Sequence, residues 1–242
     1  MKLSVKINSV FIVIFFWICA NSALFAQFKV GEELVYKARF NVIPAGKASL
    51  KVMDSTRIDD HLTYHVRFNA KTGSLADRIY KIRDQIDSWL DVEKLFAHKQ
   101  IKSIREGDYR KKIQTTFNYE EGYAVTNDDS LAVNGIIYDT YSLLYYLRTI
   151  PLIVGETHSF QAFEKKKLID FQIKVYGKET IPVPVGTFTC FVVKPFREDE
   201  KLFKNQGDMK IWLSDDANRL PVQIQIKLKY GSMLLQLKSV TL

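Results

Sequence analysis

Cysteine and histidine are both scarce in this 242-residue chain. Of two cysteines, Cys19 falls in a predicted leader, so Cys190 alone cannot form an intrachain disulfide and is expected to be buried in a strand. Among four histidines only His61 and His65 are close in sequence. Two residues four apart in a strand are separated by about 13 Å, too far to share one metal ion. We therefore expect no disulfide framework, no metal site and no cofactor.

Catalytic motifs are also missing. The chain has no Gly-x-Ser-x-Gly nucleophile motif and no glycine-rich nucleotide loop, and its 11 glycines are spread over turns. The candidates for glycoside hydrolysis are three carboxylates near Trp89, namely Asp84, Asp87 and Asp91. Because such residues on the polar face of a strand are usually solvated, we predict no catalytic residue and favour a non-enzymatic protein.

Long apolar runs are absent beyond the N-terminus. The one run, Val10–Ala20, follows a short basic start with Lys2 and Lys6. It is too short to span a bilayer, which takes roughly 20 apolar residues, but it fits a secretory signal peptide. We predict that residues 1–26 are a leader cleaved after Ala26, and that residues 27–242 form one domain without a membrane span. A retained N-terminal anchor is the alternative.

Acidic residues are fewer than basic ones, 27 against 35, so the formal net charge is +8. Two of those charges, Lys2 and Lys6, leave with the leader, and no acidic residue precedes Glu32, so the mature chain carries +6. Export argues against nucleic acid as a partner and leaves anionic lipid head groups or glycans. Acylation of Cys19 is disfavoured because the bulky residues 16–18 precede it.

Alternation of apolar and polar residues with a period of two dominates after residue 30, as half-buried antiparallel strands require. Twelve tyrosines and sixteen phenylalanines also favour strands. Turn residues recur at short intervals, as at Pro44–Gly46. About a dozen strands exceed the ~10 of a twisted open sheet, so we predict an all-β, mainly antiparallel fold, whose curved sheet forms a barrel or half-barrel. Two packed sheets are the alternative. The clearest alternating segments are 34–41, 64–71, 82–90, 171–175, 222–229 and 235–238.

One helix interrupts this pattern over residues 138–150 and is expected to cover the sheet. Asp139 is placed to cap its start, Pro151 ends it, and Arg148 suits the negative end of the helix dipole. Residues 74–80 are expected to form a second short helix or a bulged strand. The residues at helical spacing in the first helix are Tyr141, Leu144, Tyr145 and Arg148.

Four sets of residues follow one another along the chain: Phe28–Tyr36 with Ala45–Ala48, Asp139–Arg148, Val185–Phe188, and Ile211–Asp216 through Arg219–Val222. In their order and spacing these strings resemble the domain-of-unknown-function family 3108, exported proteins of Gram-negative bacteria. The resemblance implies export and a single β-rich domain, and it implies no activity or catalytic residues. The boundary Leu24–Gln27 also resembles leaders of the Bacteroidetes group.

The leading hypothesis is therefore non-enzymatic binding of a lipid-like or amphipathic molecule within the curved sheet. A structural or protein-interaction role in the cell envelope is the second hypothesis, and a glycan or ester hydrolase is the third. The periplasm is the expected compartment, with the outer membrane or the medium as alternatives, and the sequence does not specify an oligomeric state. The expected ligand-binding residues are Leu34, Tyr36, Phe40, Tyr141, Leu144 and Tyr145.

Overall fold

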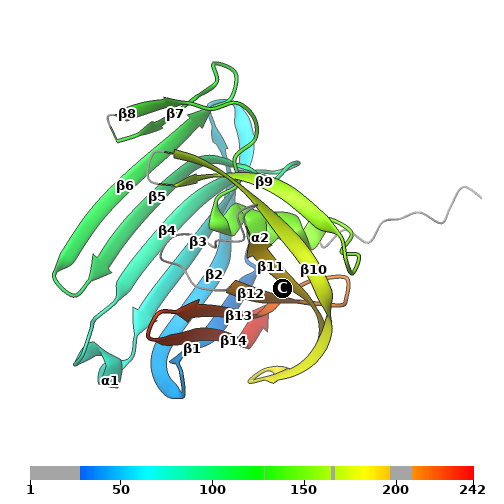
Figure 1. Cartoon of the computed structure of the whole chain (residues 1–242). Helices are drawn as coiled ribbons and strands as arrows, with labels where there is room; N and C mark the ends of the chain where they lie inside the picture. The colour runs from blue at the N-terminus through cyan, green and yellow to red at the C-terminus, as the bar shows by residue number, and fades with distance from the viewer. Residues whose placement is uncertain (1–27, 128, 165–166, 197–208) are drawn as a thin grey trace, which may run out of the picture.

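One antiparallel sheet of 14 strands forms most of the protein, and a single helix of ten residues lies against it (Figure 1). The structure is a computed structural model that describes residues 28–127, 129–164, 167–196 and 209–242. The predicted leader and Cys19 lie outside the described residues. The strands are β1 (Glu33–Phe40), β2 (Ile43–Ile58), β3 (His61–Thr72), β4 (Arg83–Asp91), β5 (Ala97–Glu106), β6 (Tyr109–Asn118), β7 (Tyr123–Thr126), β8 (Asp129–Ala132), β9 (Thr157–Glu164), β10 (Lys167–Val183), β11 (Gly186–Phe196), β12 (Met209–Ser214), β13 (Pro221–Leu228) and β14 (Gly231–Thr241), and the helices are α1 (Ser74–Asp77) and α2 (Thr140–Thr149).

The strand order follows from a simple meander in two halves. From β1 the chain adds β2 through β8 in turn on one side, crosses through α2, and then adds β9 through β14 on the other. The last strand, β14, pairs with β1 at the centre, where Tyr36 lies opposite Leu237. The two ends of the described chain therefore meet in the middle of the sheet.

The sheet is curved but not closed, because its edge strands β8 and β9 do not pair. The two sides nevertheless approach each other. The rings of Phe117 in β6 and Phe163 in β9 meet edge to face at 5.8 Å, and the Tyr138 amide donates to the Gln161 carbonyl at 3.0 Å. The half-barrel form of the predicted all-β, antiparallel fold is thus confirmed.

The predicted alternation places apolar residues of β1 and β2 on the inner face of the sheet, the face that packs against α2. Leu34 and Tyr36 of β1 are buried there beside Leu50 and Val52 of β2. Their polar neighbours in sequence point to the opposite, outer face, as the period of two in a strand requires. The two faces of this half of the sheet therefore differ in chemistry.

Helix α2 confirms the predicted covering helix and its cap. The Asp139 carboxylate accepts hydrogen bonds from the amides of Tyr141 at 2.7 Å and Ser142 at 2.9 Å, as an N-cap does. The helix ends at Thr149 because the residue before Pro151 is extended. Tyr145 belongs to one core cluster and Leu144 and Leu147 belong to a second, so α2 joins two apolar clusters.

Two local predictions have different outcomes. A short helix does form within residues 74–80, as α1. The turn expected at Pro44–Gly46 was wrong, because these residues lie in β2 and the chain reverses at Asn41, which has a positive φ of 50°. Pro44 is tolerated in the strand because the register shifts at this point, opposite Arg39. Cys190 is fully buried in β11, as predicted.

Candidate functional site

The six residues expected to bind a ligand are placed in three different surroundings. Leu34, Tyr36 and Tyr145 lie fully or almost fully buried in the first core cluster, and Tyr141 packs against that cluster. Leu144 belongs to the second cluster, and Phe40 lies apart at the end of β1 near Gly231. The structure therefore brings four of the six residues together at the first cluster and separates Leu144 and Phe40 from them.

A buried ion pair, not predicted from the sequence, anchors α2 to the sheet. Arg148 donates to both carboxylate oxygens of Glu32, at 2.7 and 2.8 Å, and both side chains are 1% exposed. Its Nε donates to the Asn218 carbonyl at 3.1 Å. Such a bidentate pair fixes the helix orientation, because both planar groups are satisfied only in one geometry.

Two tyrosine hydroxyls lie beside this ion pair. The Tyr36 hydroxyl donates to the Pro221 carbonyl at 2.8 Å, whereas the buried Tyr145 hydroxyl has no hydrogen-bond partner among the described residues. Burial raises the pKa of both, so both remain neutral. A buried hydroxyl without a partner costs free energy, so this position can accept a polar atom of a bound molecule.

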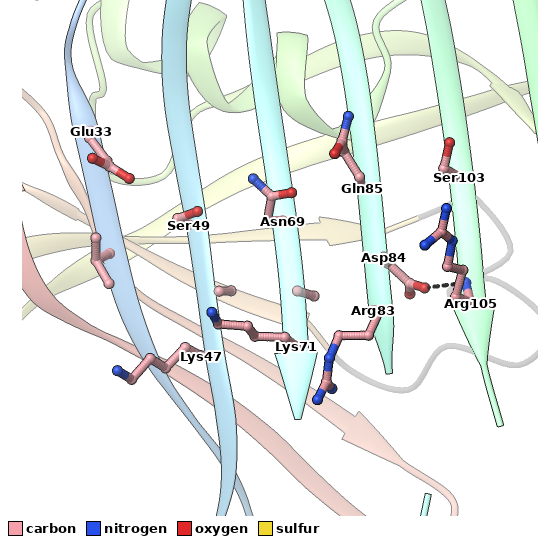
Figure 2. Close-up of a pocket in the computed structure, with 13 residues that line it drawn as sticks. Glu33, Lys47, Ser49, Asn69, Lys71, Arg83, Asp84, Gln85, Ser103 and Arg105 are labelled. Atoms are coloured by element: carbon pink, nitrogen blue, oxygen red, sulfur yellow. Dashed lines mark hydrogen bonds between the residues drawn. The ribbon is translucent and has the colours of Figure 1, made fainter. Parts of the chain in front are cut away.

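A second candidate site is an open groove of about 610 Å³ on the outer face of strands β1 to β5. Figure 2 shows polar side chains side by side on neighbouring strands across this groove. The strand register explains this arrangement, because Asn69 lies opposite Ser49 and Gln85, and Ser103 lies opposite Gln85. Their hydroxyl and amide groups can bind oxygen-rich groups. We call this the outer groove, lined by Glu33, Val35, Lys47, Ala48, Ser49, Asn69, Ala70, Lys71, Arg83, Asp84, Gln85, Ser103 and Arg105.

Basic residues in direct register run along one end of the outer groove, with Lys47, Lys71 and Arg83 in its lining and Lys37 beside Lys47. Lys37 lies opposite Lys47, Lys47 opposite Lys71, and Lys71 opposite Arg83, across four strands. We call these four residues the basic row, and Arg105 lies next to it in the groove lining. Like charges directly opposite in a sheet destabilise it. Arg83 is balanced by Asp77 at 2.6 Å, but in the part of the chain that the structure describes the three lysines have no ion pair.

The three carboxylates considered for catalysis are held in separate contacts. Asp87 accepts from His65 at 2.7 Å, Arg67 at 2.6 Å and Gln85 at 2.7 Å. Although burial alone would raise the pKa of Asp87, these hydrogen bonds lower it to about 2. A carboxylate with that pKa is ionised near neutral pH, so it cannot serve as a general acid. Asp91 accepts from backbone amides and pairs with His98, whose pKa is lowered by burial.

Asp84 is the one of these carboxylates that reaches a second acid. Burial, and then the nearby Asp84 carboxylate, raise the pKa of Glu106. Asp84 also accepts from the Arg105 amide at 2.8 Å. Asp84 and Glu106 are therefore the one pair of neighbouring acids that the three candidate carboxylates provide among the described residues.

Among residues 28–127, 129–164, 167–196 and 209–242, no group of three His, Cys, Asp or Glu side chains comes together in a way that could hold a metal ion. His65 stacks on Trp89 at 4.6 Å, and His61 stacks on His98 at 4.5 Å. In these same stretches no helix has the length and apolar character needed to cross a membrane.

Comparisons with known proteins support the fold. No curated protein matches the chain. A solved β-barrel-like protein of the domain of unknown function DUF1849 from Brucella abortus is 11% identical, with a TM-score of 0.57 covering 87% of this chain and 97% of that one. A candidate lipoprotein from Parabacteroides distasonis, 13% identical, has a TM-score of 0.39 over 90% of this chain and 98% of that one. A candidate exported protein with a YmcC-like fold from Bacteroides fragilis is 11% identical. Its TM-score is 0.35, and the match covers 91% of this chain and 100% of that one. Only the first similarity is strong enough to show a shared fold.

The resemblance seen in the sequence strings is confirmed over most of the chain. The family model described as "Protein of unknown function (DUF3108)" matches residues 35–238. That stretch includes strands on both sides of the sheet and helix α2. The chain therefore belongs to the DUF3108 family.

Proposed function

We propose that this chain is an exported, non-enzymatic protein of the cell envelope that binds an anionic amphipathic molecule, such as a phosphate-bearing lipid, on its curved sheet. The observation that carries the proposal is the basic row at the end of the outer groove. Three of its members, Lys37, Lys47 and Lys71, are aligned in direct register and have no ion pair among the described residues. An anionic group at this position relieves their mutual repulsion.

The rest of the outer groove suits the neutral part of a head group. Hydroxyl and amide side chains of Ser49, Asn69, Gln85 and Ser103 lie next to the basic row (Figure 2). Esters, sugar hydroxyls and glycerol are matched by such side chains, which can both donate and accept hydrogen bonds. The groove is open to solvent on the outer face, so a ligand can enter without displacing α2.

A second candidate is the predicted site on the inner face, under α2. The unpartnered hydroxyl of Tyr145 favours it, since the polar end of an amphipathic molecule could pair with that group while its chain contacts Tyr36 and Tyr141. Binding there requires α2 to move, because its side chains are packed against the sheet. The outer groove is therefore the first candidate.

Removal of two charges from the basic row should weaken binding of an anionic lipid. We expect the double variant Lys47→Gln/Lys71→Gln to bind dihexanoyl phosphatidylglycerol about 30-fold more weakly than the unmodified mature chain, since each lysine near an anionic head group contributes about 1 kcal/mol. Calorimetric titration of residues 27–242 at low salt, with the lipid below its micelle-forming concentration, measures this effect.

A matched control exists in the same sheet. Lys174 and Lys194 also lie directly opposite each other, in β10 and β11, away from the outer groove. The variant Lys174→Gln/Lys194→Gln should bind as the unmodified chain does. Equal weakening by both double variants would show a general charge effect, and equal affinity for dihexanoyl phosphatidylcholine would contradict recognition of an anionic group. Inorganic phosphate, titrated alone, distinguishes a lipid site from a simple anion site.

A further inference from the structure

Four turns form a continuous rim at one end of the sheet. Figure 1 shows α1 and the β1–β2 turn at this end, drawn at the bottom. Main-chain hydrogen bonds join each turn to its neighbour: Asn41 to Ser232 at 2.7 Å, Gly73 to Ala45 at 3.0 Å and Gly107 to Lys81 at 2.8 Å. We call this surface the rim, made up of residues 40–45, 73–82, 106–110 and 228–232.

The rim exposes an unusual number of large apolar and aromatic side chains. Ile79 is 89% exposed, Tyr230 is 81% exposed and Val42 is 78% exposed. Isolated exposed apolar residues are normal, but a concentration on one surface indicates an interaction site. The exposed apolar and aromatic residues of the rim are Val42, Ile43, Leu75, Ile79, Tyr80, Tyr109, Leu228 and Tyr230.

The same end of the sheet is basic. Lys37 of the basic row precedes Phe40 by three residues, which places the row about 10 Å from the β1–β2 turn. Arg83, Arg105, Arg110 and Lys81 surround a second, smaller hollow that opens beside the groove. A flat anionic surface that touched the exposed apolar side chains would therefore lie within reach of these charges.

We propose that the rim docks onto the surface of an anionic lipid bilayer, with its apolar side chains inserted between head groups. Three observations favour lipid over a protein partner. The apolar residues stand on separate turns, and tyrosines are among them as at membrane interfaces. Lysine is depleted in protein interfaces, yet Lys37, Lys47 and Lys71 lie at this same end of the sheet. The proposal goes beyond binding in the outer groove, because a bilayer surface rather than a single molecule is bound.

Vesicle co-sedimentation of the mature chain tests this docking. We expect residues 27–242 to bind vesicles of equal parts phosphatidylcholine and phosphatidylglycerol, and to bind phosphatidylcholine vesicles at least about tenfold more weakly. The triple variant Val42→Ser/Leu75→Ser/Ile79→Ser should reduce the partition coefficient on the mixed vesicles at least about tenfold, because it removes the inserting side chains. These residues are exposed, so the variant should keep the far-ultraviolet circular dichroism spectrum of the unmodified chain.

The matched control removes exposed apolar residues away from the rim. The variant Ile136→Ser/Ile153→Ser/Val154→Ser should bind mixed vesicles as the unmodified chain does. The proposal is overturned if the unmodified chain does not bind mixed vesicles, as expected for a protein-docking rim, or if both triple variants bind equally. Titration with dihexanoyl phosphatidylglycerol separates the two proposals. The rim variant should bind dihexanoyl phosphatidylglycerol as the unmodified chain does. If the unmodified chain binds mixed vesicles but not this short-chain lipid, the rim proposal stands and binding in the outer groove is contradicted.

Discussion

Replacement of Arg148 by methionine is expected to lower the free energy of unfolding by about 3–5 kcal/mol, since it leaves the Glu32 carboxylate buried without a partner. For a domain of this size the melting temperature should fall by roughly 10 °C, measured by thermal denaturation followed by circular dichroism. Glu32→Gln should cost a similar amount, because it leaves the guanidinium uncompensated. The double variant Glu32→Leu/Arg148→Met should recover much of the loss, since two apolar groups replace the pair.

A surface ion pair provides the control for this experiment. Lys178 and Asp215 lie within ion-pair distance, but their side chains are 45% and 32% exposed. Asp215→Asn should therefore lower the free energy of unfolding by no more than about 1 kcal/mol. If Arg148→Met were as mild as Asp215→Asn, the ion pair would not anchor α2 to the sheet in the way described.

Substitution of Gly46 by alanine should destabilise the sheet at the basic end of the groove by about 2–4 kcal/mol. A Cβ at this position would clash with the Lys71 carbonyl oxygen and lie 2.8 Å from the Thr72 Cα. Both are main-chain atoms of β3, so relief requires β2 and β3 to separate. The separation would also disturb the opposed Lys47 and Lys71. Chemical denaturation gives the change in the free energy of unfolding.

Gly73 is the matched control, because an added Cβ there meets no atom within 4 Å and its φ of −85° suits any residue. Gly73→Ala should change the free energy of unfolding by less than about 0.5 kcal/mol. Equal stability of the two alanine variants would contradict the close approach of β2 and β3 at Gly46.

Local features of the fold could be predicted from the sequence, and long-range ones could not. The period of two revealed the strands because each alternation lies within one segment, and Asp139 and Pro151 marked the ends of α2 for the same reason. The central pairing of β1 with β14 depends on residues about 200 positions apart. Pro44, two residues before Gly46, suggested a turn at this position. The structure instead requires glycine because β2 packs closely against the main chain of β3 there.

The candidate site shows the same limit. Lys37 and Lys71 lie in the predicted strand segments 34–41 and 64–71, and Lys47 directly follows the predicted turn. Their alignment depends on the register of three strands, which the sequence does not state. Arg148 was assigned to the helix dipole, yet its partner Glu32 is 116 positions away in sequence. Five of the six residues predicted to bind a ligand lie in or against the two core clusters beside α2, and ligand binding there stays a prediction.

Native mass spectrometry of the mature chain, purified from its own envelope under mild conditions, tests most directly whether this protein binds an anionic amphipathic molecule. We predict an additional mass, released on denaturation, that fragments as an anionic lipid and is absent from the Lys47→Gln/Lys71→Gln variant but retained by Lys174→Gln/Lys194→Gln. A chain that carries only its sequence mass, or the same bound mass in all three proteins, would contradict binding at the basic row.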